Sequence, residues 1–136
     1  MENKLTRHEA RENAFLTAFA ATFEPEQETM QGEEGAIVLD EYARRLLADQ
    51  SAHAEEIDEI ITAHLKGWTL PRVPRVSLVV LRLALAEMLY GEEKKAGVAI
   101  NEAVELVKKY GSDNDHQFVN GLLGVVAREQ EGEPQC

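Results

Sequence analysis

Cysteine is nearly missing from this chain, and long apolar runs are missing altogether. The single cysteine is the last of 136 residues, Cys136, which excludes an internal disulfide and a zinc site built from several cysteines. No stretch approaches the roughly 18 consecutive apolar residues of a membrane span, and the N-terminus lacks the apolar core of a signal peptide. We therefore expect a cytoplasmic protein that does not contact a membrane.

Catalytic patterns are also missing. The sequence contains no Gly-rich phosphate loop, no Gly-x-Ser-x-Gly turn and no cysteine placed for nucleophilic attack. Asp113, Asp115 and His116 are close in sequence, but no distant ligand and no calcium-loop glutamate accompanies them, so helix capping explains them better than a metal site. These absences indicate a binding protein without metal or cofactor, not an enzyme.

Positive charge is scarce overall, since the formal net charge is −11. Such a balance is unfavourable for nucleic-acid binding, because lysine and arginine make the phosphate contacts. The acidic residues are concentrated in segment 24–35, which we expect to be a mobile loop, and in 129–136, expected to be a disordered tail. Between Glu59 and Glu87 there is no acidic residue, whereas four basic ones occur there, which predicts a locally positive surface.

The first half of the chain shows helical periodicity. Thr6-x-x-Glu9 is a capping box, which predicts a helix over 6–22. A second helix is expected from the apolar residues of 37–47, and Ser51 is expected to cap a third. No segment alternates with period two over the length of a strand, so the sequence predicts an all-α fold.

The fourth predicted helix starts near Pro74 or Arg75 and continues through 76–90. This segment is apolar nearly all round, as is typical of a helix packed on several sides, so we expect it to be the central core helix. Arg82 and Glu87 are five residues apart and point about 140° away from each other on an ideal helix. Each is therefore expected to reach another helix.

Two more helices are predicted on either side of Gly111. In the first of them, Glu105 and Lys109 have the i,i+4 spacing of an ion pair. The last helix carries Phe118 in its first turns, flanked by amide side chains. The ring could stack on an unpaired base, and the amides could contact unpaired bases. The alternative interpretation is that Phe118 packs against Leu122.

Basic residues cluster at the start of the first helix. Lys4, Arg7 and Arg11 have i, i+3 and i+7 spacing, and His8 lies beside them. Cations at a helix N-terminus oppose the helix dipole, so a purely structural helix gains nothing from them. The cluster indicates either a phosphate-binding face or simply a solvated charged face.

Several motifs occur in a characteristic order. They are Arg-x-x-Ala-Arg at 7–11, Trp68, Leu-Arg-x-Ala-x-x-Glu over 81–87, and INEAVEL, KKYG and HQFVNG within 100–121. This series, which spans about residues 6–128, resembles the bacterial NusB family of transcription antitermination factors. The resemblance implies one domain over 1–136, in which two small helical bundles share the long central helix.

The resemblance also implies a function. It points to a factor that binds boxA-type single-stranded RNA together with ribosomal protein NusE and acts with RNA polymerase in an antitermination complex, promoting processive transcription, notably of rRNA operons. The basic start would contact the RNA backbone and Phe118 a base, and Asn114, where the family often has Asp, would repel phosphate less. The candidate RNA-binding residues are Lys4, Arg7, Arg11, Asn114, Gln117, Phe118 and Asn120, and the candidate partner-binding residues are Phe19 and Glu87.

Two alternatives belong to other classes. The domain could be a protein-interaction module or homodimer with little RNA affinity, because Arg7-His8-Glu9 is a thinner arginine run than the family often has. A similar domain also precedes the catalytic part of some RNA cytosine methyltransferases, but this sequence ends at Cys136 without room for a methyl-donor domain. Salt-sensitive RNA binding would argue against the first alternative.

Overall fold

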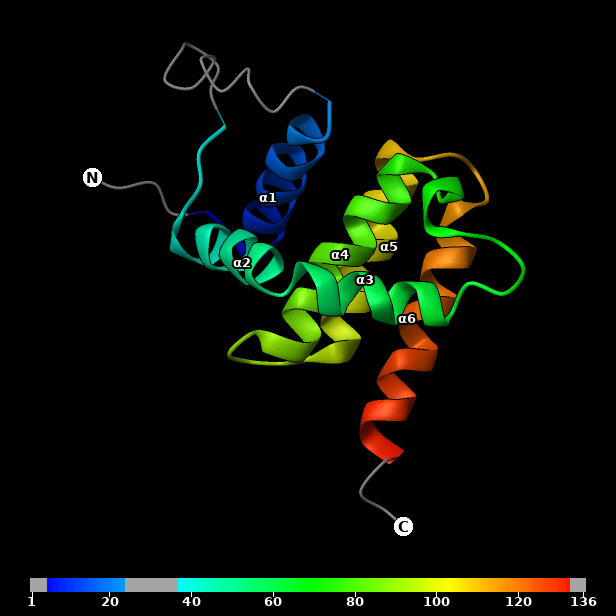
Figure 1. The fold of residues 1–136 in the computed structure, drawn as a ribbon. Coiled ribbons are helices and arrows are strands. Elements are labelled where there is room, and N and C mark those ends of the chain that lie inside the picture. The colour runs from blue at the N-terminus through cyan, green and yellow to red at the C-terminus, as the bar shows by residue number, and fades with distance from the viewer. Residues whose placement is uncertain (1–4, 24–36, 133–136) are drawn as a thin grey trace.

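The computed structural model describes residues 5–23 and 37–132, and all regular structure in that part of the chain is helical (Figure 1). The elements are α1 (Arg7–Ala21), α2 (Glu41–Ala52), α3 (Ala54–Ala63), the short 3₁₀ helix η2 (Leu70–Arg72), α4 (Arg75–Tyr90), α5 (Ala96–Tyr110) and α6 (Asp115–Gly132). The predicted all-α fold is confirmed. The expected mobile loop over 24–35 lies outside the described residues.

Helix α4 is the centre of the molecule, as expected from its apolar sequence. All five other α-helices pack against it. One group consists of α1, α2 and α4, the other of α4, α5 and α6, and Figure 1 shows α1 and α6 on opposite sides of α4 and α5. Because its neighbours cover several sides, most residues from Val79 to Met88 are buried. The expected pair of bundles with a shared helix is confirmed.

The ends of the first helices follow local capping chemistry. Thr6 Oγ1 accepts the Glu9 N–H at 3.0 Å and Glu9 Oε1 accepts the Thr6 N–H at 3.0 Å, so the predicted capping box is present. Asp40 caps α2 by accepting the Ala43 N–H at 2.8 Å. The cap expected at Ser51 is wrong, because α2 continues past it to Ala52 and α3 follows without a side-chain cap.

The last helix is longer than expected. It continues to Gly132, so residues 129–132 are helical, whereas we expected the disordered tail to begin at 129. Residues 133–136 lie outside the described part. Among the helices that the structure describes, none combines the length and apolar character needed to cross a membrane.

Charged residues of α4 are paired with other helices rather than with each other. Arg82 donates from Nε and Nη2 to Asp58 of α3, at 2.9 and 3.0 Å. Glu87 faces α1 and α2, where it accepts from Arg11 and Tyr42. The expectation that Arg82 and Glu87 would each reach another helix is therefore confirmed.

Candidate nucleic-acid interface

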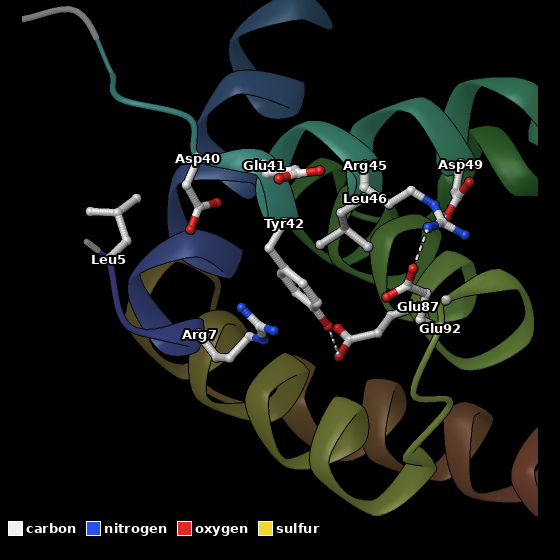
Figure 2. A pocket seen from close by; sticks show the side chains of 11 residues that line it. Leu5, Arg7, Asp40, Glu41, Tyr42, Arg45, Leu46, Asp49, Glu87 and Glu92 are labelled. Carbon is white, nitrogen blue, oxygen red and sulfur yellow. Dashed lines mark hydrogen bonds and ion pairs between the residues drawn. The ribbon is translucent and has the colours of Figure 1, made fainter. Parts of the chain in front are cut away.

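Arg7 presents the exposed cation at the start of α1. Its guanidinium carbon lies 3.9 Å from the ring centroid of Tyr42, which belongs to α2. Figure 2 shows Arg7 reaching from α1 toward this ring. Beside it, exposed His8 places Nδ1 2.7 Å from the Glu102 carboxylate of α5. Lys4, the remaining member of the predicted basic cluster, lies outside the described residues.

Arg11 has a different environment from Arg7, although both belong to the predicted phosphate-binding face. The Arg11 side chain is only 8% exposed, as is that of Glu87. Arg11 Nε donates to both Glu87 oxygens at 3.0 and 3.1 Å, and Nη2 donates to Oε2 at 2.7 Å. The structure therefore turns Arg11 and Glu87 toward each other and not toward solvent, because the side of α1 that carries Arg11 faces α4, which carries Glu87.

The phenol of the half-buried Tyr42 completes this group. Its OH donates to Glu87 Oε2 at 2.8 Å, a contact drawn in Figure 2. Burial, followed by the hydrogen bond to Glu87, raises the pKa of Tyr42 to about 12. Burial by itself would lower the pKa of Arg11, but the hydrogen bonds and charge of Glu87 outweigh it and the net shift is upward. The phenol of Tyr42 is thus neutral at neutral pH and can donate its proton to the Glu87 carboxylate in a hydrogen bond.

Phe19 occupies a separate position on α1. It is half-buried, and its ring centroid lies 5.5 Å from that of Phe15 and 5.0 Å from that of Phe23. Phe19 is about two turns further along α1 than Arg11, which holds Glu87. The structure does not bring the two candidate partner-binding residues, Phe19 and Glu87, to one point.

Lysines at the end of α5 extend the positive charge next to α1. Lys109 Nζ lies 2.6 Å from Glu12 Oε2, and Tyr110 OH also donates to this carboxylate. These hydrogen bonds, that of Lys109 first, hold the pKa of Glu12 below its usual range. The predicted Glu105–Lys109 pair is wrong, because the fold offers Lys109 a carboxylate from another helix. The neighbouring Lys108 is exposed.

The turn after α5 carries the polar candidate residues. Asn114 is exposed there, and Gln117 and Asn120 are exposed on the first turns of α6. Asp115 Oδ2 accepts the Ser112 N–H at 3.0 Å, so the first residue of α6 binds the turn before the helix and does not cap an N–H within it. In the part of the chain that the structure describes, no group of three or more metal-binding side chains is assembled.

Phe118 is half-buried and packs against Trp68 rather than standing alone on the surface. Their ring centroids are 5.0 Å apart, with the rings tilted by 54°. A groove of about 690 Å³ lies beside Phe118 between the end of α3 and α6, with Lys66 and Gln117 on its wall. Trp68 and Lys66 were not among the candidate residues, although the basic segment between Glu59 and Glu87 contains both.

The candidate residues thus form two separate clusters. Arg7 lies near the start of α1 and Phe118 lies on α6. Figure 1 shows α5 between these two helices. A ligand that touches both clusters has to extend across the surface from α1 to α6. An extended chain fits this requirement better than a compact small molecule does.

Fold and surface together define a small all-α domain with two bundles around one shared helix. The chain belongs to the NusB family, whose model matches residues 7–128. It is 40% identical to the transcription antitermination protein NusB of Geobacillus kaustophilus over 124 residues, which cover 90% of this chain and 95% of that protein. The NusB of Enterococcus faecalis is 35% identical over 147 residues, covering 97% of this chain and 96% of the relative.

Solved structures of NusB proteins show the same fold. NusB from T. maritima is 32% identical and superposes with a TM-score of 0.81, over 93% of this chain and 94% of that one. A complex of the antitermination factors NusB and NusE with double-stranded RNA contains a chain that is 32% identical, with a TM-score of 0.73, over 90% of this chain and 96% of that one.

Proposed function

We propose that this chain is a transcription antitermination factor that binds boxA-type single-stranded RNA together with ribosomal protein NusE. It acts in the cytoplasm, within the antitermination complex of RNA polymerase, and promotes processive transcription, notably of rRNA operons. Its mechanism is binding and not catalysis. Family membership, relatives named as antitermination proteins and the likeness to a NusB chain in a complex with NusE and RNA support this proposal.

The observation that carries the proposal is a series of exposed cations and amides, together with one half-buried aromatic ring, on an acidic chain. We take the RNA path to run from Arg7 on α1, by way of Lys108 and Lys109 on α5, to Gln117 and Phe118 on α6. Cations bind phosphates, while exposed ring faces stack on unpaired bases without strict sequence preference. A single-stranded RNA supplies both features along one extended chain.

The candidate RNA-binding residues have different roles in this proposal. Arg7, with Lys4, contacts the RNA backbone, and Asn114, Gln117 and Asn120 donate to or accept from bases and sugars. One base stacks on Phe118 and enters the adjacent groove, whose wall includes Lys66. The buried Arg11 does not touch the RNA. NusE adds its own basic surface, which offsets the repulsion caused by the net charge of −11.

Fluorescence anisotropy of a labelled boxA-type RNA, with and without NusE and over a salt series, tests the proposal. For a single strand, the slope of log affinity against log salt should flatten by about 0.7 when Arg7→Ala removes one phosphate contact. Phe118→Ala should lose ~1 to 3 kcal/mol, the usual value of one stacked base. Arg44→Ala is the matched control, since Arg44 is an exposed arginine on α2, outside this path.

Binding that NusE strengthens, that salt weakens and that both substitutions reduce would support the antitermination function. If no selective binding appears even with NusE, the chain is instead a protein-interaction module of the NusB fold. Sedimentation of the free protein would then show whether it pairs with a second copy.

A further inference from the structure

We propose that Tyr42 is a positioning residue that holds Arg7 in place for the RNA backbone, and that the buried Arg11–Glu87 pair holds Tyr42. This inference rests on the proposed function, in which Arg7 contacts phosphate. It gives Arg11, Glu87 and Tyr42 one shared role. The two buried residues act on RNA binding through Arg7, without reaching the RNA themselves.

The contacts form a continuous series from the core to the surface. Arg11 is fixed by three donated hydrogen bonds to Glu87, and Glu87 accepts the Tyr42 OH at 2.8 Å. Tyr42 is half-buried, so one part of its ring is anchored while a face remains available to Arg7. Figure 2 shows the phenol pointing to Glu87 and the Arg7 guanidinium beside the ring.

Stacking suits an arginine that has to bind a phosphate. The guanidinium is planar, so one face can lie on an aromatic ring while the N–H groups at its edge stay free to donate. A carboxylate partner would occupy those same N–H groups and cancel the charge. Within the described residues Arg7 forms no ion pair, whereas Arg11 is bound to Glu87 in this way.

Carboxylates near Tyr42 could compete with RNA for Arg7. A pocket of about 510 Å³ adjoins Tyr42 and Arg7, and carboxylates from Asp40 and Glu41 also line it. Asp40 is engaged in capping α2, through the Ala43 N–H. Without the ring, the flexible Arg7 side chain could turn toward Glu41 and lose its availability to RNA. Tyr42 therefore opposes a competing ion pair on its own helix.

A mutant cycle on the full-length protein with NusE and labelled boxA-type RNA tests the inference. Tyr42→Leu should weaken RNA binding by about two- to fivefold, the equivalent of one exposed cation–π contact. In an Arg7→Ala background the same change should have no further effect, because there is no guanidinium left to hold. Tyr42→Phe keeps the ring and should lose less affinity than Tyr42→Leu.

Tyr90→Leu is the matched control for removing a tyrosine. Tyr90 donates to Glu56 and stacks on His53 at a ring-centroid distance of 3.6 Å, whereas the ring under the Arg7 guanidinium is that of Tyr42. It should leave RNA affinity unchanged. Additive losses for Arg7→Ala and Tyr42→Leu would overturn the inference and leave Tyr42 with a structural role alone.

A second measurement on the free protein separates this inference from the proposed function. The NMR signals of the Arg7 side-chain protons should be displaced by the ring current of Tyr42, retain that displacement in Tyr42→Phe and lose it in Tyr42→Leu. If the displacement is present but wild-type protein binds no RNA, the proposed function fails while the stacking stands. If the displacement is missing, the positioning role is refuted whatever the RNA result.

Discussion

Removing one member of the Arg11–Glu87 pair should destabilise the protein far more than removing both. In Glu87→Leu, the Arg11 guanidinium, whose side chain is 8% exposed, keeps its charge but loses its three hydrogen bonds. Breaking a buried ion pair from one side usually costs about 3 to 5 kcal/mol, because an uncompensated charge stays out of water. The total stability of a domain is about 5 to 15 kcal/mol, so this variant should fold but be marginal.

The double variant Arg11→Met/Glu87→Leu leaves no buried charge. Substitution of both partners by apolar residues is often neutral or stabilising. Here the Tyr42 OH loses its acceptor, which costs about 1 to 3 kcal/mol if it remains buried. The double variant should therefore be less destabilised than Glu87→Leu, with a strongly non-additive cycle.

Chemical denaturation measures these differences, and thermal unfolding checks them. For a chain of this length each kcal/mol corresponds to roughly 3 to 4 °C, so Glu87→Leu should lower the Tm by about 10 to 20 °C. The reasoning would be refuted if Glu87→Leu cost less than about 1 kcal/mol, as an exposed pair would. The reasoning would also be refuted if the cost of Glu87→Leu and the cost of Arg11→Met simply added up to the cost of the double variant.

Three further predictions follow from the same structure. Because the pKa of Tyr42 is about 12 instead of 10.0, the stability that its neutral phenol contributes is complete below pH 10 and is lost as the pH rises toward 12. Titration followed by tyrosinate absorbance should show a step at high pH that Tyr42→Phe removes. Because the pKa of Glu12 is lowered from 4.5, the contribution of its carboxylate to stability is complete above pH 4.5 and is lost as the pH falls through the pKa of the folded state. Urea denaturation should show that Glu12→Gln is less stable than wild type by about 0.5 to 1 kcal/mol at neutral pH. In acid the two proteins should be equally stable. Leu85→Ala in the fully buried centre of α4 should cost about 2 to 5 kcal/mol by calorimetry, while exposed Lys108→Ala should stay within about 0.5 kcal/mol of wild type.

Helix positions could be predicted from the sequence because their signals are local. The capping box at Thr6 and Glu9 involves residues three apart, and Gly111 ends α5 where expected. The apolar sequence of α4 likewise predicted a central helix. The Ser51 prediction failed since a serine that can cap a helix can also lie within one, and capping preference alone does not end the helix before it.

Partner choice among the charged residues could not be predicted in the same way. Lys109 has Glu105 four residues earlier, yet it binds Glu12 of α1, because the packing of α5 beside α1 brings the Glu12 carboxylate to 2.6 Å from Lys109 Nζ. Phe118 similarly packs against Trp68, from a segment that folds back onto α6. Spacing along a helix predicts which residues share a face of that helix, but not which residues of other helices this face contacts.

The sequence by itself determined the helices, the central position of α4 and the family motifs that run from α1 to α6. Tertiary structure alone decided that Arg7 is exposed while Arg11 is buried, although they lie one turn apart on α1. That decision depends on Glu87, which is 76 residues away from Arg11 and meets it when α1 packs on α4. The role of Tyr42 could not be predicted from the sequence for the same reason. Its position between Arg7 and Glu87 arises only when α1, α2 and α4 pack together.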